Sequence, residues 1–160
     1  MNILVGIAAA IALVVAGGIA FVRLTPDDAS LQHLDPLAAA RTGKPNDVLL
    51  APDGTPGAAR PAPVWEGSPR ALMEALNEIA LAAPRVRLLA GSPGELFATY
   101  VQRSRIVGYP DYISVRALPA GDGKATLAIY SRSRWGSSDF GVNAGRVSAW
   151  LGAIPLPEAR

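Results

Sequence analysis

The chain has 160 residues, about the length of one domain, and its 15 Lys and Arg against 13 Asp and Glu leave a formal charge of +2, which excludes a polybasic nucleic-acid arm or an acidic tail. Half of the residues are hydrophobic, 18% are charged and the mean hydropathy is +0.25, so the composition is more apolar than that of ordinary soluble domains and indicates contact with lipid. With no cysteine and one histidine, the sequence excludes disulfides, thiolate ligands and multi-histidine metal sites, and we expect no metal and no other cofactor.

An uncharged apolar segment from Ile3 to Val22 predicts a single transmembrane helix that contacts membrane lipid. At about 1.5 Å per residue, such a helix spans roughly the 30 Å hydrocarbon core. Gly18 and Ala20 would also suit cleavage of a signal peptide before Phe21. No basic residue precedes the segment, however, and it is longer than the usual signal core. We therefore predict a retained anchor, or an uncleaved signal, over residues 1–23.

Two further features of this segment bear on assembly and orientation. Ala8, Ala12, Ala16 and Ala20 recur every four residues along one helix face, which would permit a homo-oligomer, although an alanine-rich span also produces this spacing by chance. Arg23 follows the apolar segment, and by the positive-inside rule it favours a cytoplasmic C-terminal domain.

Residues 24–67 predict a proline-rich, extended spacer or wrapping segment. Seven of the 14 prolines lie between Pro26 and Pro63, and apolar residues show no sustained periodicity there. Residues 23–83 hold five basic and eight acidic side chains, whereas residues 84–146 hold nine basic and four acidic. The simplest interpretation is that the first part lies over the second; an anionic partner or lipid surface is the alternative.

Residues 68–154 predict an α+β domain, followed by a tail at residues 155–160. Ser68 and Pro69 are typical of a helix start, and Pro84 ends that helix at Ala83. Alternating apolar residues then predict four strands, around Val86–Ala90, Phe97–Val101, Ile113–Ala117 and Ala125–Ile129. Short turns join them, so we expect a four-stranded antiparallel meander packed against two helices, the second from Gly141 to Ile154 with Ser138 or Asp139 as its cap.

Polar residues should converge at one edge of this sheet. Strand parity places five of them on the core-facing side: Arg103, Arg105, Asp111, Ser131 and Ser133. Asp139 and Asn143, at the start of the second helix, must arrive at the same edge. Because buried charges need partners, we expect Arg103 or Arg105 to bond Asp111 or Asp139. The cluster is either a structural network that holds the last helix or a site for a small anion.

Three segments resemble the family known as domain of unknown function 1499. They are Tyr130-Ser-Arg-Ser-Arg-Trp-Gly-Ser-Ser-Asp-Phe-Gly-Val-Asn143 with Arg146 and Trp150-Leu151, then Ser104-Arg-Ile-Val-Gly-Tyr-Pro-Asp-Tyr112, and His33-Leu-Asp-Pro36 with Pro45-Asn46. The resemblance covers most of residues 31–152. It implies a small α+β domain that is often tethered to or exported across a membrane, with no established activity, cofactor or partner.

The same resemblance implies a set of family-typical positions: Arg105, Asp111, Ser131, Arg132, Ser133, Arg134, Gly136, Asp139, Gly141, Asn143 and Arg146. Many relatives carry a cysteine-containing segment that this chain lacks, so no redox or lipid-attachment role carries over. Because relatives are exported, the resemblance favours an extracytoplasmic, periplasmic-side domain on a single-pass membrane protein, against the orientation that Arg23 suggests.

Two functional hypotheses follow. The first is a membrane-anchored cell-envelope module, non-catalytic, that binds a protein partner or a small anionic ligand. The second is a cofactor-free, hydrolase-like enzyme that uses the Asp, Ser and Arg cluster with His33 as the base, in a segment that also contains Asp35. We expect no nucleic-acid binding. Tyr100, Tyr112 and Tyr130, with Arg87 and Arg116, should instead form a sheet face that the wrapping segment or a protein covers.

Overall fold

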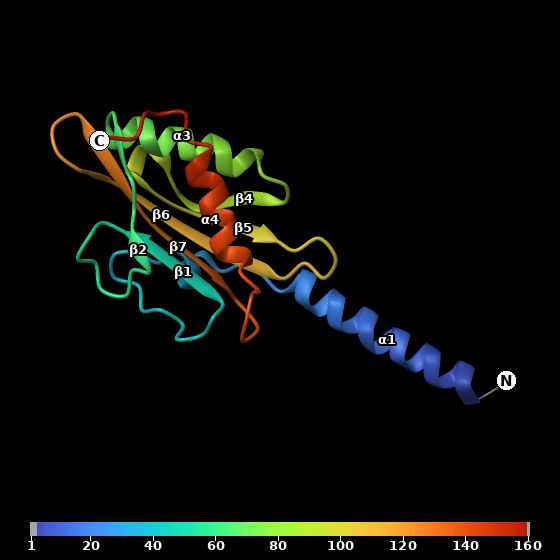
Figure 1. Ribbon diagram of the computed structural model, residues 1–160. Helices are drawn as coiled ribbons and strands as arrows, with labels where there is room; N and C mark the ends of the chain where they lie inside the picture. Colours follow the sequence, from blue (N-terminus) through green and yellow to red (C-terminus); the bar gives the residue numbers. More distant parts are fainter. Residues whose placement is uncertain (1–2, 160) are drawn as a thin grey trace.

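The computed structural model describes residues 3–159 and consists of a long N-terminal helix followed by an α+β domain (Figure 1). Helix α1 (Ile3–Leu24) has 22 residues, which corresponds to about 33 Å. It is long and apolar enough to cross a membrane, and its apolar part does not pack inside the domain. Figure 1 shows it pointing away from the domain. The predicted helix is therefore confirmed, and its place in a membrane stays a prediction.

The remaining helices are short, and all but the last begin at a residue whose side chain caps them. They are α2 (Ala29–Gln32), α3 (Pro69–Ala82), the single 3-10 turn η1 (Pro93–Glu95) and α4 (Val142–Gly152). The Ser68 hydroxyl accepts a hydrogen bond from the amide of Ala71 at 3.1 Å, and α3 ends just before Pro84. Both predicted helices of the domain are thus present.

The sheet contains seven strands. They are β1 (Asp47–Ala51), β2 (Arg60–Pro61), β3 (Val64–Glu66), β4 (Val86–Ser92), β5 (Phe97–Arg103), β6 (Pro110–Pro119) and β7 (Lys124–Ser133). The order is β2-β1-β7-β6-β5-β4, and β3 also pairs with β7. The predicted meander is present as β4 to β7. The prediction of a four-stranded, purely antiparallel sheet was wrong, because three strands were missed and β1 pairs with β2 in parallel.

The three missed strands come from the proline-rich segment. Strand β1 pairs antiparallel with the second half of β7, with Leu49 opposite Tyr130, and β3 pairs with its first half, with Trp65 opposite Ala125. Strand β7 therefore lies in the middle of the sheet. Leu50 and Trp65 are each 1% exposed, so this segment supplies part of the core rather than a surface spacer.

One face of the sheet packs against α3 and α4, as Figure 1 shows. The core between them consists mainly of aliphatic residues from every layer, together with the aromatic side chains of Trp65 and Trp150. Tyr100 also lies on this face, where its ring meets Trp150 edge to face and its hydroxyl donates to Asn77 at 3.0 Å.

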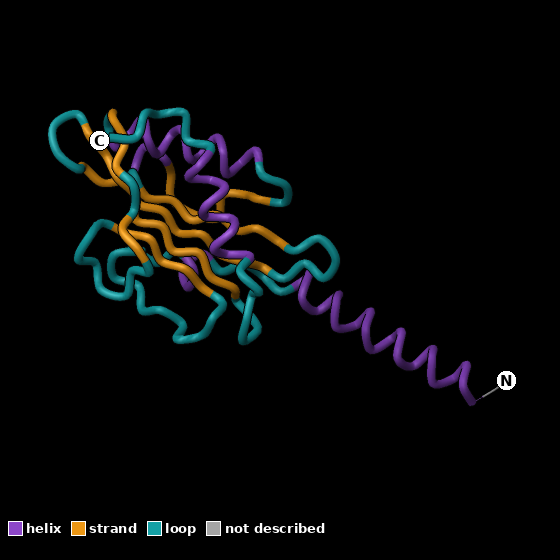
Figure 2. The backbone as a smooth tube through the Cα atoms, viewed as in Figure 1, coloured by secondary structure: helices purple, strands orange, loops and turns teal. Residues whose placement is uncertain are grey.

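The opposite face is covered by residues 24–46, which we call the covering segment. Figure 2 shows α2, part of this segment, behind the sheet and across it from α3 and α4. Ion pairs join the segment to the sheet, including Asp27 with Arg103 and Asp35 with Arg116. The interpretation that the acidic part lies over the basic part agrees with these contacts.

The predicted facing of β5 was wrong. Ala98 and Tyr100 face the helices, whereas Thr99 and Val101 face the covering segment. The four residues 98–101 of β5 are all buried, on both faces of the sheet, so alternation cannot reveal which face meets the helices. As a consequence Arg103, which follows Thr99 and Val101 by parity, lies on the side opposite to Asp111.

Candidate functional site

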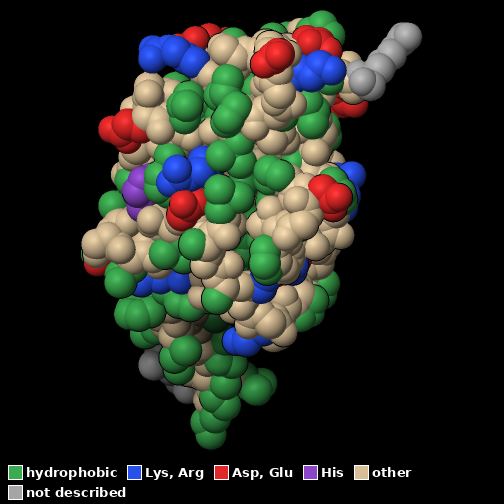
Figure 3. Space-filling view, turned by 90° about the vertical axis from the view of Figure 1, so that its left-hand side faces the viewer, with side chains coloured by type: hydrophobic (Ala, Val, Ile, Leu, Met, Phe, Trp, Pro, Cys, Tyr) green, Lys and Arg blue, Asp and Glu red, His purple; other side chains and the backbone are tan. Residues whose placement is uncertain are grey.

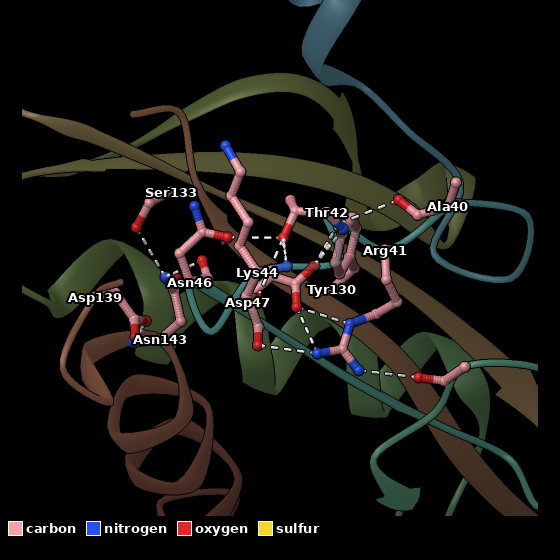
Figure 4. Close-up of polar contacts among 11 residues, drawn as sticks. Ala40, Arg41, Thr42, Lys44, Asn46, Asp47, Tyr130, Ser133, Asp139 and Asn143 are labelled. Carbon is pink, nitrogen blue, oxygen red and sulfur yellow. Dashed lines mark hydrogen bonds and ion pairs between the residues drawn. The ribbon is translucent and has the colours of Figure 1, made fainter. Parts of the chain in front are cut away.

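Five of the predicted polar residues meet on the helix face, and we call them the polar cluster: Asp111, Ser131, Ser133, Asn143 and Arg146. Strands β6 and β7 present the first three at one end of the sheet, and α4 presents the other two. Figure 4 shows Ser133 and Asn143 beside the start of β1.

Arg146 is held by acceptors on all sides. It donates to Asp111 Oδ2 at 2.6 Å, to Asn143 Oδ1 at 2.6 Å and to Ser131 Oγ at 3.0 Å, and its Nε donates to Gln102. Its side chain is only 6% exposed. A guanidinium so fully engaged has little capacity left for a ligand, so the cluster is built to attach α4 to the sheet.

Asn143 links the cluster to the segment before β1. It has no exposed surface, and its Nδ2 donates to the carbonyl of Asn46 at 3.2 Å and to Ser133 Oγ at 3.1 Å. Asn46 in turn donates to the carbonyl of Gly136 at 2.8 Å. The family-like segment of residues 130–143 and the Pro45-Asn46 pair are therefore parts of one hydrogen-bonded unit.

Asp139 bonds amides at the start of α4, as predicted, although the N-cap residue itself is Gly141. Its carboxylate accepts from the amides of Gly141 at 2.9 Å and Asn143 at 2.8 Å. Burial alone would raise its pKa, but these amide hydrogen bonds outweigh burial and the pKa of Asp139 lies below its usual value. The expected bond from Arg103 or Arg105 to Asp111 or Asp139 was wrong, because Arg146 pairs with Asp111 instead. Arg105 lies exposed in the β5–β6 loop.

The other face of the sheet holds a second polar centre that the sequence patterns did not reveal. Asp27, in the covering segment, accepts from Arg103 at 2.9 Å, from the hydroxyl of Tyr112 at 2.9 Å and from Arg87 at 2.6 Å. Burial raises the pKa of Asp27, but these three hydrogen bonds more than offset burial and lower it. Arg134 completes the group by donating to the carbonyl of Pro26 at 2.9 Å.

Arg132 lies deeper on this face. It is 6% exposed, its guanidinium lies over the rings of Tyr112 and Tyr130, and one nitrogen donates to the carbonyl of Gln32 at 2.9 Å. Among residues 3–159, its Nη1 is the one buried side-chain nitrogen or oxygen without a hydrogen bond. Two tyrosine rings and a carbonyl thus stabilise a cation that forms no ion pair within the described chain.

Asp47 forms the third polar contact across this face (Figure 4). Arg41, the amide of Thr42 and the hydroxyl of Tyr130 all donate to its carboxylate. Burial raises the pKa of Asp47, and these hydrogen bonds lower it further than burial raises it. Burial and the neighbouring carboxylate raise the pKa of Tyr130 to about 12. The sequence signal that could have found this contact is the short spacing of Arg41, Thr42 and Asp47.

His33 does not reach the predicted nucleophiles. Its Nδ1 lies 2.9 Å from Thr99 Oγ1 and its ring stacks on Phe97, whereas Ser131 faces α4 through the opposite side of the sheet. Asp35 pairs with Arg116 at 3.0 Å. The geometry therefore does not join His33 and Asp35 to the polar cluster, and the arrangement that the hydrolase hypothesis needs is not formed.

A cleft of about 480 Å³ opens beside the polar cluster, between the β5–β6 loop and the β7–α4 loop. Its walls are largely aromatic and apolar, and its polar side chains are two aspartates and three serines. The full lining is Ser104, Tyr109, Pro110, Asp111, Ser133, Trp135, Gly136, Ser138, Asp139, Phe140 and Val142. Within residues 3–159, no group of three His, Cys, Asp or Glu side chains is placed to hold a metal ion.

Comparison with protein families gives one match. The model of the family described as "Protein of unknown function (DUF1499)" matches residues 38–154, which include β1 and every residue of the polar cluster. No curated protein and no solved structure matches the chain.

Proposed function

The chain belongs to the DUF1499 family, whose function is unknown, and we propose that it is a membrane-anchored, non-catalytic binding module of the cell envelope whose site is the cleft beside the polar cluster. One observation carries this proposal: the cleft of about 480 Å³ has the size and the mixture of aromatic walls and few polar atoms that small ligand sites have. Helix α1 would hold the module at the membrane, with the domain on the extracytoplasmic side.

The lining of the cleft favours a ligand with an apolar or aromatic body and a hydrogen-bond donor or positive charge. Asp111 and Asp139 are its charged groups, and no Lys or Arg lines it. Arg146, the nearest arginine of the cluster, is committed to Asp111, Asn143, Ser131 and Gln102. A protein side chain or small molecule of this kind therefore fits better than the small anion that the sequence suggested.

A photo-crosslinker placed in the cleft tests the proposal in cells. We expect benzoyl-phenylalanine at Val142, which is 53% exposed, to give a discrete adduct, and the same probe at Asp122, in the exposed β6–β7 turn, to give none. Ser138→Trp, at an exposed position in the lining, should fill the cleft and abolish the adduct without changing the thermal unfolding curve.

Equal labelling at positions 142 and 122, or an adduct that persists in the Ser138→Trp variant, would contradict a site in the cleft. The enzyme hypothesis has its own test. His33→Gln should still restore the phenotype of a deletion strain if the module does not use His33 as a base, and loss of complementation by a folded variant would favour catalysis.

A further inference from the structure

Exposed apolar side chains gather at the end of the domain from which α1 leaves. Ile106 and Tyr109, in the β5–β6 loop, are 75% and 47% exposed, and Phe140 and Val142, around the start of α4, are 95% and 53% exposed. Figure 1 shows both loops beside the end of α1. Figure 3 views the opposite end of the domain, where acidic and basic side chains are scattered over the surface. We call Ile106, Tyr109, Trp135, Phe140 and Val142 the membrane-proximal rim.

The rim contacts the last turn of α1 through Trp135 and the backbone of Ile106. Trp135 stacks on Phe21 with ring centroids 6.5 Å apart and meets Tyr109 edge to face at 5.9 Å. Arg23 donates to the carbonyl of Ile106 at 2.7 Å. Gly108 allows this approach, because a Cβ at this position, where φ is +88°, would lie 2.9 Å from Arg23 Cγ. The β5–β6 loop is thus closely packed against α1.

The orientation of α1 is fixed by Arg103 as well. This side chain donates to the carbonyls of Val22 at 3.2 Å and Thr25 at 3.1 Å, which are acceptors at the end of the helix, and it pairs with Asp27 at 2.9 Å. The first residues after α1 therefore bind the sheet directly, and no flexible linker separates the helix from the domain.

These contacts set the depth of the rim. Phe21 and Arg23 lie at the end of the apolar segment, where a spanning helix passes from hydrocarbon into the headgroup layer. Trp135 contacts Phe21 and Ile106 accepts from Arg23, so these two residues lie at the same depth, and Tyr109 lies beside them against Trp135. Tryptophan and tyrosine are the side chains that prefer this layer, and Arg105 adds a positive charge beside anionic headgroups.

Phe140 lines the same cleft as Tyr109 and Trp135. It is 95% exposed and has φ of +54°, a left-handed conformation that is rare for a bulky residue. We propose that the membrane-proximal rim lies in the headgroup layer of the leaflet that α1 enters, so that the mouth of the cleft opens at the bilayer surface. The proposal rests on α1 crossing a membrane and does not depend on any ligand of the cleft.

Single cysteines test the rim directly, because the chain has none of its own. The full chain would be reconstituted in vesicles of phosphatidylcholine and phosphatidylglycerol with a nitroxide at position 106 or 140. Val15→Cys, in the middle of α1, serves as the lipid reference, and Asp122→Cys, in the exposed β6–β7 turn, serves as the water reference. Collision with oxygen is compared with collision with a water-soluble nickel complex.

We expect the labels at positions 106 and 140 to give an oxygen-to-nickel collision ratio between the high ratio at position 15 and the low ratio at position 122, as for side chains in the headgroup layer. Circular dichroism shows that each variant is folded. Labels at positions 106 and 140 that behave like the one at position 122 would overturn the proposal and leave the rim as a surface for another protein. The collision ratios report the depth of the rim alone. The rim can therefore lie at the membrane even if crosslinking finds no ligand in the cleft, and crosslinking can find a ligand even if the rim lies in water.

Discussion

Asn143 is the side chain on which most of the polar cluster depends. Fully buried, it both donates and accepts: Nδ2 bonds Asn46 and Ser133, and Oδ1 accepts from Ser131 and Arg146. A buried amide with its hydrogen bonds formed is nearly neutral in energy, but its loss leaves several partners unsatisfied at once.

We therefore expect Asn143→Leu, which keeps the approximate volume but forms no hydrogen bond, to lower the free energy of unfolding by about 3 kcal/mol. Denaturant unfolding measures this change. Ser137→Ala, at an exposed position in the β7–α4 loop, should leave the midpoint unchanged. A loss below about 0.5 kcal/mol for Asn143→Leu would show that the surrounding groups find other partners.

Three partly buried carboxylates make the domain sensitive to acid. Hydrogen bonds hold the pKa of Asp27, Asp47 and Asp139 below the usual value although burial acts in the opposite direction. The unfolded chain binds protons at about pH 4, before the folded chain does, so these groups stabilise the fold above that pH and the stabilisation is lost as the pH falls through their folded pKa values.

The expected result is a denaturation midpoint that is constant from about pH 7 to pH 5 and falls steeply below about pH 4. Asp27→Asn should be less stable at neutral pH and should lose less stability on acidification. Chemical denaturation at a series of pH values measures both effects. An identical pH slope in the variant would mean that Asp27 does not contribute to acid sensitivity.

At the level of elements, the sequence predicts those helices and strands that a local sequence pattern determines. The start of α3 depends on Ser68 and Pro69, and the meander depends on alternating residues between short turns, so both are confirmed. Strands β1, β2 and β3 were not predicted. In β1 (Asp47–Ala51) apolar and polar residues do not alternate, and β2 and β3 have only two and three residues. Their pairing with β7 depends on the whole fold.

The polar cluster shows the same division between local and long-range signals. Asp111, Ser131 and Ser133 were predicted from strand parity, and Asn143 from its place at the start of α4. Arg103 was assigned to the wrong face because β5 is buried on both sides. Asp27 could not be found, since it lies about 75 residues before Arg103 and nothing local marks the pair.

Two fragments test how much the proline-rich segment contributes. Residues 24–160 should unfold cooperatively, whereas residues 68–160 should not. The shorter fragment lacks β1 and β3, which pair with one side of β7, and it lacks the core side chains of Leu50 and Trp65. Circular dichroism and urea titration distinguish the two. A cooperative transition for residues 68–160 would mean that the helices and the meander form a sufficient core without β1 and β3.

At the scale of the whole molecule, the end of α1 and the sheet form one body. Our proposal of an extracytoplasmic domain predicts that Asp122→Cys, in the turn farthest from α1 in Figure 1, reacts with a membrane-impermeant maleimide in intact cells. Reaction only after permeabilisation would instead support the cytoplasmic orientation that Arg23 favours. The membrane fraction of the same cells should contain the full-length chain.

The direct attachment of the covering segment to the sheet also limits what the protein can touch. Strand β6 begins next to Tyr109 and its ten residues extend about 33 Å toward the β6–β7 turn. Under our proposal that α1 crosses a membrane, the absence of a flexible linker would hold the domain at a fixed height above the bilayer. A binding partner would then have to reach that height to contact it.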